Sequence, residues 1–155
     1  MAIEGLETLL RNHPRFKDFP DDFLAAVAGC GKNMVFKKGD YLFHEGEDAD
    51  YLYMIREGLV SLEMDAPGQG PMTFMTETRG GVIGLTWLIP PYVWTFDARA
   101  REDTRIVAFD AHCLRGKCNK DPALGYAVMK QFMPVIVERL HDTRVQLLDL
   151  YRARN

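Results

Sequence analysis

Between residues 34 and 110 the chain alternates short runs of strand-forming residues with turns that contain glycine. The runs are rich in aromatic and β-branched side chains, and several alternate apolar with polar residues, as half-buried strands do. The turns contain Gly39, Gly46 and Gly58, and glycine adopts positive φ at little cost. This series predicts a mainly β fold, a β-roll or jelly roll. The expected strands lie within residues 34–43, 51–55, 59–64, 72–78, 98–101 and 105–109.

Helices are expected on both sides of this β region. Leucines at three-and-four spacing, together with Ile3, predict a first helix that ends before Pro14. Residues 21–27 predict a second. Asp121-Pro122 is a strong start signal for a third, in which Pro134 must introduce a kink or a division. Beyond it a heptad seam is expected to meet a second helix. The seam residues are Ile136, Leu140, Thr143, Leu147 and Leu150.

The length and charge of the chain limit its organisation and its partners. A chain of 155 residues predicts one domain. Its net charge of −3 argues against a nucleic-acid partner, which needs a concentrated basic surface. No apolar run reaches the roughly 18 residues that a membrane span requires. The N-terminus has no apolar signal core, so we expect a cytoplasmic protein without a membrane partner.

Three cysteines, Cys30, Cys113 and Cys118, give an odd number and no disulfide framework. In a cytosolic protein we therefore expect reduced, buried thiols. No metal site is expected, because zinc needs four ligands and no second cysteine or histidine pair has matching spacing.

An ordered series of motifs identifies the family. A Lys-Gly-Asp turn at 38–40 is followed by an acidic glycine turn at 44–48, and an aromatic strand at 51–55 leads to Glu57-Gly58. This order and spacing resemble the catabolite-activator (Crp/Fnr) type sensor domains of the cyclic-nucleotide-binding-domain family. The resemblance covers roughly residues 15 to 151.

The resemblance implies a β-roll of about eight strands within a single domain that covers residues 1–155. Residues 1–30 would form short N-terminal helices, 34–110 the roll, and 111–155 the C-terminal helices. In the family the long last helix pairs with its copy in a homodimer and lends polar residues to the ligand. Thr143 and Arg144 lie in the matching segment. A DNA-reading module follows that helix in the family, and none is expected before Asn155.

Residues 84–100 have the length of the family's phosphate-binding cassette but not its charges. Where family members have a glutamate after the glycine, this chain has Leu85 after Gly84. Where they have an arginine ten residues after the glycine, it has Trp94. The short helix expected after Gly84 would keep free backbone N–H groups, but the paired arginine is replaced by a ring. Cyclic nucleotide is therefore a doubtful ligand, and no other cofactor is expected.

Aromatic rings replace the missing charge, and three interpretations stay open. The rings fill the pocket and nothing binds, or they line a cavity for a neutral or aromatic ligand, or a cyclic nucleotide binds in another way. Threonines would supply the polar groups of a lined cavity. The candidate pocket residues are Gly84, Leu85, Thr86, Trp87, Trp94, Thr95, Phe96, Thr143 and Arg144, with Tyr92 as a further ring.

We therefore predict a non-enzymatic sensor or regulatory module that binds a small ligand or a protein partner and reports through its last helix. The alternative is an interaction protein with a vestigial pocket that acts by dimerisation and partner docking. A redox or metal sensor that uses Cys113, Cys118 and His112 is a third possibility. No nucleophile motif or ATPase-type phosphate loop favours an enzyme.

Overall fold

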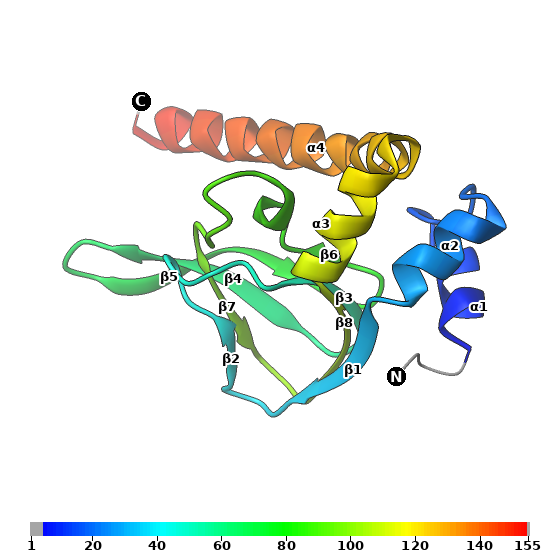
Figure 1. The fold of residues 1–155 in the computed structure, drawn as a ribbon. Helices are drawn as coiled ribbons and strands as arrows, with labels where there is room; N and C mark the ends of the chain where they lie inside the picture. The colour runs from blue at the N-terminus through cyan, green and yellow to red at the C-terminus, as the bar shows by residue number, and fades with distance from the viewer. Residues whose placement is uncertain (1–4, 155) are drawn as a thin grey trace.

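Eight antiparallel strands make up two four-stranded sheets in the computed structural model, which describes residues 5–154 (Figure 1). In the first sheet the order is β1 (Gly31–Phe36), β8 (Thr104–Asp110), β3 (Tyr51–Glu57) and β6 (Val82–Ile83). In the second it is β2 (Tyr41–Phe43), β7 (Asp97–Ala100), β4 (Val60–Ala66) and β5 (Gly70–Glu77). The predicted β-roll is confirmed.

The glycine turns of the roll have the predicted geometry. Gly39, Gly46 and Gly58 have φ of 96°, 88° and 120°. At Gly58 an added Cβ would lie 2.7 Å from the Cα of Thr104, so neither the backbone angle nor the space tolerates a side chain. This turn therefore sets how closely β3 and β4 approach the start of β8.

Among residues 5–154, four α-helices lie outside the roll: α1 (Leu6–Arg11), α2 (Asp21–Ala28), α3 (Ala111–Lys120) and α4 (Pro122–Arg154). The predicted start of α4 is confirmed, because the Asp121 carboxylate accepts from the backbone N–H of Ala123 at 3.2 Å. The helix continues through Pro134, and its first turns run in a different direction from the rest (Figure 1). Ile3 lies outside the described residues. Within residues 5–154, no helix has both the length and the apolar character to cross a membrane.

Phe16 joins three parts of the fold. Its ring lies 6.3 Å from that of Phe109 on β8 and 5.8 Å from that of Phe132 on α4. Both partners are buried, as is Phe16 itself. The segment between α1 and α2 therefore packs against the first sheet and against the start of the long helix.

Arg99 on β7 points away from the core, as the alternation with buried Ala98 and Ala100 predicts. Its guanidinium donates to the carboxylate of Glu63 on β4 at 2.6 Å, and this carboxylate is buried. The buried carboxylate of Glu63 needs an opposite charge beside it, and Arg99 is that partner.

The expectation of three reduced thiols is wrong. Cys30 and Cys113 form a disulfide whose Cα atoms lie 5.7 Å apart, and Cys118 alone is free. The two cysteines are 83 residues apart in sequence. They meet because β1 pairs with β8, so that the end of α2 and the start of α3 are adjacent. The number and spacing of cysteines carry no information about such a pairing.

Reducing this disulfide, or replacing Cys30 by serine, is expected to lower the free energy of unfolding by about 2–4 kcal/mol, because the bond closes a long loop in the unfolded chain. Thermal unfolding with and without dithiothreitol measures the change. A Cys118→Ser variant should respond to the reductant as the wild type does, whereas Cys30→Ser should not respond. Burial raises the pKa of the Cys118 thiol, which slows its alkylation in the native state. Alkylation of all three cysteines in the unreduced, unfolded protein would contradict the prediction.

Candidate functional site

Gly84 forms a tight turn between β6 and the short 3-10 helix Thr86–Leu88, with φ of 99°. A Cβ at this position would lie 2.5 Å from Cη2 and 2.8 Å from Cζ3 of Trp94. The far edge of the Trp94 indole therefore packs directly on the turn. Only glycine allows this approach, and it allows the backbone angle as well.

Trp94 is buried, with only 3% of its surface exposed. Its ring stacks on that of Phe43, with centroids 3.6 Å apart and planes 9° from parallel. Its carbonyl accepts from the backbone N–H of Gly46 at 2.8 Å, and its backbone N–H donates to the carbonyl of Glu47 at 2.9 Å. Both bonds tie Trp94 to the β2–β3 turn. Stacking and main-chain bonds together hold the indole against Gly84.

The four rings predicted for one pocket lie in different places. Phe96 lies near Trp94, with its centroid 5.6 Å from that of Phe43. The Tyr92 ring lies under the guanidinium of Arg115 on α3, with its centroid 4.1 Å from the guanidinium carbon. Trp87 is buried on the side of α4. Sequence alone placed these rings within ten residues of one another, but the bends at the prolines and at Tyr92 direct them to three surroundings.

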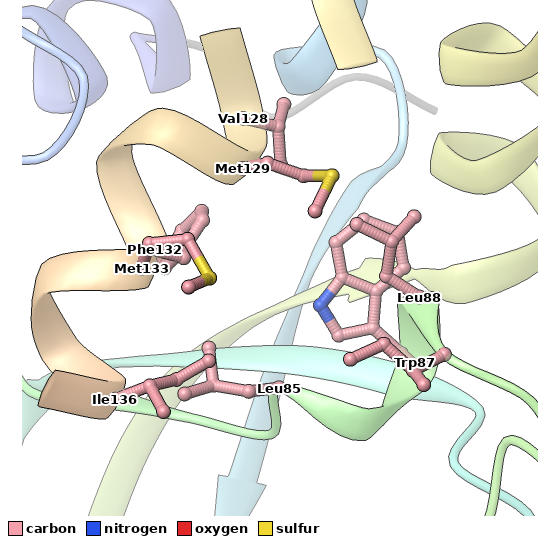
Figure 2. Close-up of a pocket in the computed structure, with 9 residues that line it drawn as sticks. Leu85, Trp87, Leu88, Val128, Met129, Phe132, Met133 and Ile136 are labelled. Atoms are coloured by element: carbon pink, nitrogen blue, oxygen red, sulfur yellow. The ribbon is translucent and has the colours of Figure 1, made fainter. Parts of the chain in front are cut away.

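Trp87 and Leu85 line a small apolar cavity beneath α4, which we call the helix cavity (Figure 2). Figure 2 shows the Trp87 indole facing α4, and Leu85 beside Ile136. The cavity volume is about 30 Å³, room for little more than a water molecule. The remaining lining residues are Leu88, Ile89, Val128, Met129, Phe132 and Met133. Leu85 therefore packs on the long helix.

The polar candidates do not converge on this cavity. The Thr86 hydroxyl is buried and has no hydrogen-bond partner in the described part of the chain, while Thr95 is exposed. Thr143 is exposed on α4 and donates to the carbonyl of Arg139 at 2.8 Å. Arg144 is exposed beside it. Of these residues, Thr86 alone has a buried hydroxyl, and it does not line the helix cavity.

Arg139 fastens α4 to the strand that leads into the Gly84 turn, a role not predicted from the sequence. Its guanidinium donates to the carbonyl of Val82 at 2.6 Å and to the carboxylate of Glu77 at 3.1 Å. Only the approach of α4 to β5 and β6 reveals this contact. Arg139 and the helix cavity together connect the cassette to the long helix.

A second, larger pocket opens between the two sheets at β1, β2 and β3, and we call it the roll pocket. Its volume is about 520 Å³. Trp94, Phe43 and Tyr53 are part of its lining, and none of residues 84–87 is. Burial raises the pKa of the Tyr53 phenol well above its usual value, and the charges of Asp50 and Glu47 act in the same direction. The other lining residues are Met34, Phe36, Leu42, Gly46, Asp48 and Tyr51.

Residues 33–121 match the sequence model of the cyclic nucleotide-binding domain, which is more than half of the chain. The chain belongs to the cyclic nucleotide-binding domain family. Its fold is that of a Crp/Fnr-type regulatory sensor domain, as the motifs predict.

Solved structures and characterised proteins of this family resemble the chain at low identity. A protein of Geobacter metallireducens GS-15, named for cyclic nucleotide binding, is 29% identical, with a TM-score of 0.78 over 87% of this chain and 98% of that one. The catabolite activator protein of Thermus thermophilus shares the fold, with a TM-score of 0.71, 20% identity and coverage of 89% and 63%. Human cGMP-dependent protein kinase 2 is 27% identical over 101 residues, 64% of this chain and 13% of the kinase. The chain therefore spans only a small part of the kinase.

Proposed function

We propose that the chain is a non-enzymatic sensor or regulatory module that does not bind cAMP or cGMP in the way usual for its family. The observation that carries the proposal is the buried indole of Trp94 packed on the Gly84 turn. By the family pattern, Trp94 stands at the place of the phosphate-binding arginine and Leu85 at that of the glutamate. An indole offers no charge to a cyclic phosphate.

Three arginines near the cassette in sequence or in space are already engaged. Arg115 donates to the carbonyl of Trp87 and lies over the Tyr92 ring. Arg99 is committed to buried Glu63 on the far face of its sheet. Arg139 is bonded to Val82 and Glu77. A hydrogen bond to a charged group contributes about 1.5–3 kcal/mol, so the loss of a bidentate pair weakens binding by about two to four orders of magnitude.

The long helix would report the state of the module. Leu85 and Trp87 of the cassette pack on α4 at the helix cavity, so a change at the cassette would move the helix directly. We propose that the exposed half of α4 pairs with a second copy through Ile136, Leu140, Thr143, Leu147 and Leu150.

Thermal unfolding in the presence of 1 mM cAMP or cGMP tests the proposal, and we expect a shift of less than about 2 °C. A ligand at 100 times its dissociation constant would stabilise the native state by about 2.7 kcal/mol, which is a shift of roughly 5–11 °C in a chain of this size. AMP is the matched control for effects of the phosphate. A shift of that size with either cyclic nucleotide, and not with AMP, would contradict the proposal.

A second candidate is an interaction protein whose ligand pocket is vestigial. It is favoured by further exposed apolar residues on α4 outside the seam, which include Tyr126 and Val137. Large exposed apolar patches commonly mark protein interaction sites.

A further inference from the structure

The disulfide joins the end of α2 to the first turn of α3. Cys30 lies between α2 and β1, and Cys113 lies in the first turn of α3. A second link lies beside the disulfide, because the ammonium of Lys117 on α3 donates to the carbonyl of Ala26 on α2 at 2.7 Å. The covalent bond and the hydrogen bond together fix the position of α3 against α2.

The helix α3 lies between the cassette and the long helix. The guanidinium of Arg115 donates to the carbonyl of Trp87 and lies over the Tyr92 ring. At its other end α3 leads directly into α4 (Figure 1), where Gly125 packs on the main chain of Cys118. A Cβ at Gly125 would lie 3.3 Å from the Cys118 carbonyl oxygen. A displacement of α3 would therefore act on the cassette and on α4 alike.

The surroundings of the disulfide favour its reduction. Cys113 is half-buried whereas Cys30 is buried, so a thiol reaches the sulfur of Cys113 first. Lys117 follows Cys113 by one helical turn, so the two side chains share a face of α3. The Lys117 ammonium also lies 2.8 Å from the position that a Cβ at Gly29, the neighbour of Cys30, would take. This cation and the positive end of α3 stabilise thiolates, whereas the carboxylate of Asp110, which caps the helix, opposes them.

From this arrangement we propose that the disulfide is a redox-sensitive tether, through which a thiol reductant changes the packing of α3 on the cassette. A first thiolate of the reductant attacks the sulfur of Cys113, the S–S bond breaks, and Cys30 leaves as a thiolate. A second thiolate attacks the reductant's sulfur in this mixed disulfide and releases Cys113. The two reductant thiols are oxidised to a disulfide, and the chain gains two electrons and two protons as two thiols.

The tether requires a reduced chain that stays folded. Residues other than the two cysteines pack the joined elements on the core, because Leu24 and Val27 of α2 and Leu114 of α3 are buried. The hydrogen bond from Lys117 to Ala26 does not depend on the disulfide. The S–S bond is therefore a local constraint on α3. This redox input goes beyond the proposed sensor role and does not depend on any ligand of the cassette.

Buffers of reduced and oxidised glutathione, applied to the full chain without denaturant, test the proposal. Alkylation followed by mass spectrometry counts the thiols, and we expect a reversible gain of two at millimolar reduced glutathione. In ¹H–¹⁵N spectra, the Trp87 indole N–H and the Leu88 backbone N–H should shift with the same midpoint as the thiol count. The N–H of Gly68, in the β4–β5 turn, is the internal control. The spectrum should keep the dispersion of a folded chain.

Variants separate the reduction of the disulfide from its effect on the cassette. Arg115→Gln should gain the two thiols as the wild type does, while its Trp87 and Leu88 resonances shift much less. Lys117→Gln should lower the equilibrium constant for reduction about two- to fivefold, the effect of one nearby charge. Lys38→Gln is the matched control, since it removes the same charge from an exposed turn of the roll. A variant with serine at both Cys30 and Cys113 should show the reduced spectrum in oxidising buffer.

Reduction by glutathione only after unfolding, loss of the folded spectrum on reduction, or unchanged Trp87 and Leu88 resonances in the reduced chain would each overturn the proposal. So would an equal effect of Lys38→Gln and Lys117→Gln. These outcomes leave the proposed function intact, because that proposal fails on the response to cyclic nucleotides. A cyclic-nucleotide shift in thermal unfolding, in turn, would leave the glutathione titration unchanged.

Discussion

Replacing Trp94 by alanine is expected to lower the free energy of unfolding by about 3–5 kcal/mol, the usual cost of removing a buried aromatic side chain. The melting temperature should fall by roughly 6–20 °C in a chain of this size. The physical reason is the loss of the stack on Phe43 and of the contact with the Gly84 turn. Thermal and urea unfolding of the two proteins measure the change.

This prediction distinguishes a ring that fills the pocket from one that merely lines it. A side chain kept for a ligand would be partly exposed without that ligand, and its removal would cost little. Thr95→Ala is the matched control, because Thr95 is the next residue in the chain and is exposed. We expect a change within about 0.5 kcal/mol there. A cost below about 1 kcal/mol for Trp94→Ala would show that the indole is not a structural part of the cassette.

The sequence was sufficient to predict the roll because its turns are local. Gly39, Gly46 and Gly58 each need positive φ, and the strands between them alternate or are rich in aromatic residues. The cap of α4 is equally local, since Asp121 accepts from the backbone N–H of Ala123. By contrast β6 was missed, because two residues are too few for a pattern.

The features of the site that were missed all depend on distant pairs. The bond between Cys30 and Cys113 follows from the pairing of β1 with β8. The contact of Arg139 with Val82 follows from the path of α4 across β6. The roll pocket brings Met34 together with Trp94, 60 positions further along the chain, and the sequence between them carries no pattern that would predict it. Local spacing predicts turns and caps, whereas cavities and cross-links require the assembled fold.

Placing lysine at both Leu140 and Leu147 is expected to convert a dimer to a monomer. Beyond Val135 no residue of α4 up to Arg154 is buried, and the two leucines are 48% and 51% exposed. An amphipathic helix of this length gains most of its stability from packing, so its exposed apolar seam implies a partner helix. Heptad spacing, at which both leucines stand, is what a two-helix seam requires.

Light scattering at micromolar concentration measures the result, with a mass near 17.7 kDa expected for the variant and twice that mass for the wild type. The double variant removes four leucines per dimer that the interface would bury, at about 1.5–3 kcal/mol each. Dimer affinity should therefore fall by at least a hundredfold. Val145→Lys is the matched control: it makes the same kind of change at a similarly exposed position, 44%, on the side of the helix opposite the seam. A monomeric wild type, or a Val145→Lys variant that dissociates as readily as the double variant, would contradict a dimer formed through this seam. The contacts of α4 with the cassette and with β6 run through residues up to Arg139, so the monomer should keep its fold. Any ligand response that the monomer loses would then depend on the pairing of the two helices.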